Sequence, residues 1–306
     1  MNALEVKDLH FSYSDQKNKK EALQGLSFSC EKGSIHGLLG PNGSGKSTCF
    51  KIISTQISIQ KGEVLILGKN LKANSKAIRN DMGICFQSPS LDPLLSVEEN
   101  LLLQASLFGI SKTQASSRIS ELAKIFSLTD KLNLRVKQLS GGWARRVELT
   151  KSLLHSPKIL LLDEPTTGLD PLVRREFWRE LHKLRHEGVS IIVTTHHMEE
   201  AEMCDEISFI HQGKCVASGT PAQLKKEISS DVINLSFVEM NPTLISKLNS
   251  LSKAEELSAL NFRIRTDNAQ NLIPAFMSEF GNNLNSLSWD KGNLADLYFL
   301  KTGENL

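Results

Sequence analysis

The residues best suited to chemistry form one short run from Gly40 to Thr48 (G-P-N-G-S-G-K-S-T), which fits the spacing G-x-x-x-x-G-K-[ST]. Glycines let such a loop curl so that successive backbone N–H groups point at phosphate oxygens. Lys46 would reach the outer phosphates as a point charge, and the Ser47 hydroxyl would ligate Mg²⁺. The run therefore predicts a nucleotide-binding loop made of Gly40, Pro41, Asn42, Gly43, Ser44, Gly45, Lys46, Ser47 and Thr48.

A pair of carboxylates is the second chemical feature. Asp163 and Glu164 directly follow four aliphatic residues that begin at Ile159, a pattern typical of a strand buried on both faces of a parallel sheet. Such a strand delivers the acids to the sheet edge where ligands of open α/β sheets bind. Adjacent buried carboxylates are costly without a cation, and Mg²⁺ supplies one. We expect Asp163 to hold the metal and Glu164 to polarise an attacking water.

Weaker candidates lie on either side of these two features. Tyr13 could offer a nucleotide base a stacking face, although an aromatic residue in a strand is more often part of the core. Ser140, followed by two glycines, is a good N-cap for a helix over 144–154, and that helix start could bind a second anion. His196 and His197 end a predicted strand, so we expect their rings to point to opposite sides, one near the phosphates and the other in solvent.

The elements that must position these residues follow an alternating pattern. Residues 3–39 contain three strand-like runs, interrupted by an exposed charged turn over 15–21. A helix should open directly after the phosphate loop, and further buried strands are expected at 159–164 and 189–195. These elements predict an α/β fold.

Residues 88–137 have a different character and form a predicted helical insert. Pro89 and Pro93 mark its start, and apolar residues between Ile119 and Phe126 keep a helical period. Within it, Leu91, Leu94 and Leu95 are candidates for exposed apolar contacts with a partner or, equally, for core positions.

Composition narrows the class of protein. A chain of 306 residues predicts one large domain plus a smaller one, or two of middling size. Apolar residues make up 40% and charged residues 23%, which are ordinary values for a soluble globular protein. A net charge of +2 gives a nucleic-acid partner no electrostatic support, so we expect none. The five cysteines lack C-x-x-C spacing, which indicates reduced thiols in the cytoplasm.

The composition shifts near residue 229, which predicts a boundary between a nucleotide-binding domain over 1–228 and a smaller domain over 229–306. The second part offers strands at 232–237 and 262–265 and helices at 242–251 and 268–279, with a final helix over 294–300. Including a possible strand near 255–257, these runs suggest a small β-α-β-β-α-β unit.

Taken in order, these motifs resemble those of the ATPase subunit of ABC transporters, and the resemblance covers residues 3 to about 228. Gly40–Thr48 is similar to the Walker A loop, Gln87 to the Q-loop glutamine, and Leu139–Trp143 to the signature. Ile159–Glu164 is similar to the Walker B strand. The remaining matches are Tyr13 with the base-stacking aromatic, Gly168–Asp170 with the D-loop and His196 with the switch histidine.

The resemblance implies a P-loop NTPase core with a parallel sheet, an N-terminal antiparallel β part and the helical insert, plus the small α+β domain. It implies that ATP and Mg²⁺ bind, that Gln87 joins Ser47 and Asp163 around the metal, and that Glu164, His196 and Gln87 act in catalysis. Ser140 and Gly142 would bind the γ-phosphate of ATP held by a second ATPase subunit in a head-to-tail dimer.

The resemblance also implies a place and partners. The chain would lie at the cytoplasmic face of the membrane and drive an integral-membrane permease of the type 2 exporter branch, which handles drugs, polysaccharides, lipids or ions. One alternative is a soluble ABC ATPase that acts on ribosomes or DNA. The other is a nucleotide-gated regulatory subunit, which intact Glu164 and His196 disfavour and Trp143 weakly favours. Trp143 stands where the family pattern L-S-G-G-Q has glutamine.

Overall fold

The computed structural model describes residues 1–15, 18–88, 90–228 and 231–304. Its contacts divide the chain into two compact units, Met1–Pro221 and Ala222–Leu306. The two units meet before residue 228, because most of helix α8 (Pro221–Lys226) groups with the second unit. Glu227, directly after α8, pairs there with Lys301 at 2.8 Å.

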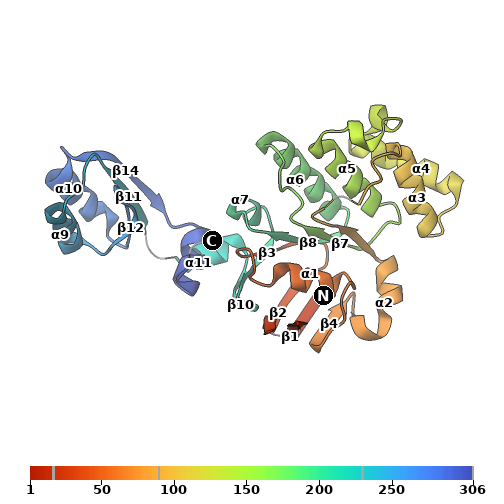
Figure 1. Ribbon diagram of the computed structural model, residues 1–306, viewed down its shortest axis with the longest axis horizontal. Helices are drawn as coiled ribbons and strands as arrows, with labels where there is room; N and C mark the ends of the chain where they lie inside the picture. Colours follow the sequence, from red (N-terminus) through yellow and green to blue (C-terminus); the bar gives the residue numbers. More distant parts are fainter. Residues whose placement is uncertain (16–17, 89, 229–230, 305–306) are drawn as a thin grey trace. The chain divides into compact units, whose positions relative to one another are not determined.

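The first unit is built on a six-stranded sheet in the order β10-β9-β3-β8-β7-β6 (Figure 1). Neighbouring strands are parallel except for β10, which runs antiparallel to β9. Strands β3, β7 and β8 are almost wholly buried, as their aliphatic sequences require. The strands are β3 (Ile35–Leu39), β6 (Met82–Cys85), β7 (Ile159–Asp163), β8 (Ser190–Thr195), β9 (Glu206–His211) and β10 (Lys214–Gly219).

Because β3 and β7 are both parallel to β8, their C-terminal ends lie at the same edge of the sheet. The phosphate loop follows β3 and the acid pair follows β7, so the fold brings the two chemical features of the sequence together. Strand β7 ends at Asp163, one residue earlier than predicted. Helix α1 (Lys46–Ile53) follows the loop and packs between this sheet and an antiparallel one (Figure 1).

The antiparallel sheet has the order β2-β1-β4-β5 and forms the N-terminal β part of the predicted fold. Its strands are β1 (Asn2–Asp15), β2 (Asn18–Glu31), β4 (Lys61–Ile66) and β5 (Lys69–Asn70). The charged turn predicted over 15–21 is wrong in extent, because β1 reaches Asp15 and β2 begins at Asn18. Residues 16 and 17, the rest of that turn, lie outside the described residues.

The predicted helical insert contains α3 (Val97–Leu107) and α4 (Lys112–Ile125), followed by two short 3₁₀ turns, η1 (Thr129–Lys131) and η2 (Val136–Gln138). Both helices begin with capping boxes, at Ser96 and Ser111, which satisfy the first free N–H groups of each helix. Pro89, which marks the predicted start of the insert, lies outside the described residues. The other helices of this unit are α2 (Leu71–Asn80), α5 (Gly141–Ser152), α6 (Pro171–His186) and α7 (Met198–Ala201).

The second unit has the predicted β-α-β-β-α-β order and ends in helix α11 (Leu294–Thr302). Its antiparallel sheet has the order β12-β13-β11-β14, and a core led by Phe237, Phe276 and Phe280 packs the two helices on one face. The elements are β11 (Asp231–Phe237), α9 (Pro242–Leu251), β12 (Ala254–Ser258), β13 (Asn261–Thr266), α10 (Ala269–Phe280) and β14 (Leu284–Lys291). The sequence did not place β14, because most of its side chains are exposed and polar.

Across the described parts of both units, none of the helices has the length and apolar character that crossing a membrane would require.

Candidate functional site

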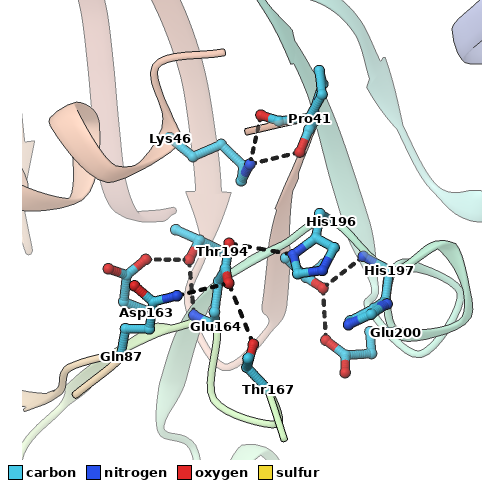
Figure 2. A network of polar contacts seen from close by, with 12 residues as sticks. Pro41, Lys46, Gln87, Asp163, Glu164, Thr167, Thr194, His196, His197 and Glu200 are labelled. Carbon is cyan, nitrogen blue, oxygen red and sulfur yellow. Dashed lines mark hydrogen bonds and ion pairs between the residues drawn. The ribbon is translucent and has the colours of Figure 1, made fainter. Parts of the chain in front are cut away.

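The phosphate loop turns tightly between β3 and α1. Gly40 has no room for a side chain, since a Cβ there would lie 2.2 Å from the carbonyl oxygen of Ile210. Gly45 caps α1 with φ of 113°, a left-handed conformation that favours glycine. The Lys46 ammonium lies inside the curl and donates to the carbonyl oxygens of Gly40 (2.5 Å) and Pro41 (3.0 Å) (Figure 2). The loop therefore presents the α1 N-terminus and a lysine to one point, as an anion site requires.

Two buried polar groups support this assignment. The Lys46 side chain belongs to a residue only 4% exposed, and this burial lowers its pKa, while the nearby carboxylates of Glu164 and Asp163 act in the opposite direction. Ser44 Oγ is also buried and has no hydrogen-bond partner within the described part of the chain. Buried polar atoms are normally satisfied, so a phosphate oxygen would complete the loop.

A pocket of about 460 Å³ opens beside the loop. Tyr13 lies on its wall, 42% exposed, with its hydroxyl 3.3 Å from Thr48 Oγ1 and its ring edge-on to Phe11 at 4.9 Å. The ring is thus neither core nor free, and it shares one pocket with Lys46. The lining residues are Tyr13, Lys20, Glu21, Ala22, Gln24, Asn42, Gly43, Gly45, Lys46, Ser47, Thr48 and Gln212.

Hydrogen bonds from the neighbouring strand β8 hold the acid pair in place. Thr194 Oγ1 donates to the Asp163 carboxylate and accepts from the Glu164 backbone N–H at 3.0 Å. Glu164 adopts φ of 42°, in the left-handed region that non-glycine residues seldom enter. Such strain persists where the surroundings over-determine it, often at functional sites. Burial raises the pKa of Asp163, which the bond from Thr194 and the charge of Lys46 partly offset.

Three side chains from three loops converge on the Glu164 carboxylate (Figure 2). Gln87 Nε2 donates to Oε2 at 3.0 Å, and Thr167 Oγ1 donates to the same atom at 3.3 Å. His196 Nδ1 lies 3.3 Å from Oε1. The structure therefore brings together Gln87, Glu164 and His196, three predicted site residues from distant segments of the sequence. A carboxylate held in this way can accept a proton from a water molecule placed beside it.

The donor set also fits Mg²⁺, which prefers oxygen ligands and usually keeps substrate phosphates in its shell. Asp163 supplies a carboxylate, and exposed Ser47 and Gln87 supply a hydroxyl and an amide. Among the described residues, no three His, Cys, Asp or Glu side chains group into a metal site. A metal here would thus depend on this mixed set together with a bound phosphate.

The expectation that His196 and His197 point to opposite sides is wrong. Strand β8 ends at Thr195, so neither histidine obeys strand alternation. Their rings lie 4.0 Å apart at an angle of 40°. Burial and then the His196 charge lower the pKa of His197.

The signature residues lie away from this pocket. Ser140 is the N-cap of α5 and is exposed, and its side chain makes no capping bond. A Cβ on Gly142 would meet Val173 Cγ1 of α6 at 2.9 Å. Neither Ser140 nor Gly142 lines the pocket that contains Lys46. Their predicted role toward a second subunit stays a prediction.

Trp143, the departure in the signature, is half-buried and lies close to two cations. The Arg146 guanidinium lies 4.8 Å and the Lys131 ammonium 5.6 Å from the ring centroid. The ring thus contacts Arg146 of its own helix. Arg145 is buried instead and donates to the carbonyl oxygens of Phe86, Asp163 (3.2 Å) and Pro165 (2.7 Å).

Sequence reasoning missed Arg145 and Thr194 as parts of the site. Arg145 ties helix α5 to the segments that carry Gln87 and the acid pair, and Thr194 orients the acids. Arg145 lies in a charged helix and Thr194 in a strand rich in β-branched residues, and both contexts are common. The feature that could have identified Thr194 is the strand register that pairs it with Asp163.

Comparison with known proteins identifies the family to which this site is similar. The ABC transporter family model matches residues 23–167, which include the phosphate loop and the acid pair. The probable multidrug ABC transporter ATP-binding protein YbhF of Escherichia coli (strain K12) is 40% identical over 228 residues, which are 74% of this chain but 39% of that protein. The chain thus spans well under half the length of that relative.

Other relatives are similar over most of their length. The Nod factor export ATP-binding protein I of Rhizobium etli is 38% identical over 77% of this chain and 74% of its own. The linearmycin resistance ATP-binding protein LnrL of Bacillus subtilis (strain 168) is 31% identical over 94% of this chain and 96% of its own.

Solved structures of ATP-binding cassettes are similar to this chain in fold. The ATP-binding subunit of an ABC transporter superposes with a TM-score of 0.65 at 30% identity, over 74% of this chain and 92% of that one. The post-hydrolysis dimer of the cassette MJ0796 with ADP and Pi gives 0.66 at 28% identity, over 71% and 98%.

Proposed function

The chain belongs to the ABC transporter family as an ATPase of the exporter type, and we propose that it powers a membrane exporter assembled from separate subunits. The resemblance drawn from the sequence, the predicted α/β class and the predicted ATPase are confirmed by these relatives and structures. Relatives named for export and drug resistance favour this function over an ATPase acting on ribosomes or DNA, and over a regulatory subunit.

The observation that carries the proposed mechanism is the convergence of Gln87, Thr167 and His196 on Glu164. Glu164 takes a proton from the water that attacks the terminal phosphate, and its three neighbours hold the carboxylate in place. Lys46 and the α1 N–H groups bind the outer phosphates, and Tyr13 stacks on the base. Mg²⁺, held by Ser47, Asp163 and Gln87, would neutralise developing phosphate charge.

The same proposal assigns partners and place. Ser140 and Gly142 bind ATP on a second ATPase subunit, which fits the exposure of Ser140 and the position of both residues outside the chain's own pocket. An integral-membrane permease would bind the helical insert, where Leu94, Leu103 and Leu107 are 65%, 53% and 75% exposed. The chain would then lie at the cytoplasmic face of the membrane.

We further propose that residues 229–306, with α8, form an accessory domain of this subunit. The LnrL similarity covers 94% of the chain and so extends into that unit. The names of the relatives, which refer to multidrug transport, Nod factor export and linearmycin resistance, point to an organic molecule as cargo.

The substitution Glu164→Gln tests the mechanism, because it keeps the shape and removes the charge. We expect ATP binding to persist, turnover to fall about 100-fold or more, and an ATP-bound dimer to accumulate in size-exclusion chromatography. As a contrast, Lys46→Ala should weaken ATP binding itself. Wild-type turnover in Glu164→Gln would remove Glu164 from catalysis, and unchanged ATP affinity in Lys46→Ala would contradict the phosphate assignment.

A further inference from the structure

A buried carboxylate that the mechanism does not use lies directly behind the site. Glu200, in helix α7, is 1% exposed and stands beside the turn that carries His196 and His197 (Figure 2). Thr195 Oγ1 donates to its Oε2 at 2.7 Å, and Thr166 Oγ1 donates to its Oε1. Arg174 Nε of helix α6 lies 3.6 Å from Oε1. Three segments therefore meet on one side chain.

Burying a carboxylate is expensive unless hydrogen bonds and a counter-charge compensate it. Glu200 has both, yet a neutral side chain could fill the same space without that cost. The reason for a carboxylate at this position therefore lies in the groups that it binds. Its neighbour Glu199, on the same short helix, has a side chain 86% exposed that lies 3.9 Å from Arg174.

The bonds of Glu200 end on both sides of the reacting pair. The Thr195 hydroxyl that donates to Glu200 also accepts from the His197 backbone N–H at 3.0 Å, so the chain is fixed before and after His196. Thr166 follows Glu164 closely, and the Thr167 backbone N–H donates to the Glu164 carbonyl at 3.3 Å. The carboxylate thus connects the turn of His196 to the loop of Glu164.

We infer that Glu200 is a positioning residue, which sets the approach of His196 to Glu164 by holding Thr195 and Thr166 in one arrangement. This inference rests on the proposed function, in which His196 and Glu164 act together. Glu200 lies outside the pocket that contains Lys46 and the phosphate loop. Its loss should therefore slow turnover and leave nucleotide binding unchanged.

The test compares Glu200→Gln with Glu199→Gln in the full chain, by steady-state ATPase kinetics and by ATP binding. A glutamine keeps the size but replaces one acceptor oxygen with a donor, so one of the two threonine hydroxyls can no longer donate to it and has to reorient. We expect kcat to fall about 10- to 100-fold, because a misplacement of about 1 Å can cost about 100-fold. ATP affinity should stay within about twofold, and Glu199→Gln should match the wild type in both.

A second pair of variants protects the test against misfolding. Thr195→Val removes the hydroxyl at nearly constant volume and should reproduce the loss of kcat, and Thr195→Ser restores the hydroxyl and should rescue it. Wild-type kcat in Glu200→Gln, or no rescue by Thr195→Ser, would overturn the inference. His196→Ala is measured in parallel: if it retains full turnover, the proposed role of His196 has failed, whereas a slow His196→Ala beside a fully active Glu200→Gln defeats only the positioning role.

Discussion

The imidazole of His196 faces the carboxylate of Glu164, with Nδ1 3.3 Å from Oε1. The two residues follow neighbouring parallel strands, β7 and β8, whose register pairs Asp163 with Thr194. Parallel strands end at one edge of a sheet, so this register brings the segments after them together. Strand order therefore places the two segments side by side, and the bonds around them set the contact between the side chains.

We predict that His196→Ala lowers kcat about 100-fold and leaves ATP affinity nearly unchanged, because the phosphate loop lies on another strand. A phosphate-release assay measures kcat, and an ATP titration measures the affinity. The control is His197→Ala, which keeps the His197 backbone bond to Thr195 and should lose far less activity. Equal losses in the two variants would show that the paired rings matter only as packing.

A second prediction concerns pH and His155, which connects the helical insert to the sheet. Its ring stacks on Phe108 at 3.8 Å, and Nε2 donates to the carbonyl of Met82 at 2.9 Å. Burial lowers the pKa of His155, which that bond partly opposes. The folded state therefore binds fewer protons than the unfolded state just below the unfolded pKa of about 6.5, so stability is lost as pH falls through that region.

The measurement is the decrease in melting temperature between about pH 7.5 and about pH 5.5. His155→Gln should show a smaller decrease than the wild type, because it removes the group that resists protonation. His186→Gln, at an exposed position of α6, is the control and should follow the wild type. The assignment to His155 fails if both variants show the same decrease in melting temperature as the wild type.

The sequence was sufficient where one short run carries both the chemistry and its position. The ranges 35–48 and 159–164 each combine a strand with functional residues at its end, so the sheet edge follows from the pattern. Gln87, by contrast, had meaning only through the family resemblance, because a polar residue after a strand is usually solvated.

What the sequence could not supply are contacts between segments far apart in the chain. Thr194, Arg145 and Glu200 act through strand register and through carbonyl or hydroxyl partners, and their residue types are common in strands and helices. The left-handed backbone of Glu164 is likewise a product of its neighbours, since no local pattern favours it. The exposed strand β14 lacked the alternation of a half-buried strand.

The third prediction tests the permease surface. Leu94 is 65% exposed at the start of the insert, whereas Leu91 and Leu95 are half-buried. Leu94→Asp should fold and hydrolyse ATP normally but no longer co-purify with a membrane subunit, because a charge opposes apolar burial. Leu95→Asp is the contrast and should lower the melting temperature. Retained co-purification of Leu94→Asp would exclude this leucine from the interface.

The last prediction concerns Trp143, whose ring contacts Arg146 and Lys131. Each cation–π contact at an exposed site contributes about 0.5–1 kcal/mol, and Arg146 also pairs with Glu176 of α6. The ring thus stiffens the start of α5, next to Ser140 and Gly142. If a second subunit's ATP binds there, the indole affects the closed dimer without touching the chain's own pocket.

We therefore expect Trp143→Gln to keep ATP binding by the monomer and to change the stability of the ATP-bound dimer, measured by size-exclusion chromatography in the Glu164→Gln background. Trp143→Phe retains an aromatic face between the two cations and should give an intermediate effect. An unaltered dimer equilibrium together with a lower melting temperature would contradict the role at the dimer seam. That result would assign Trp143 to packing within its own subunit, where Lys131 and Arg146 already hold it.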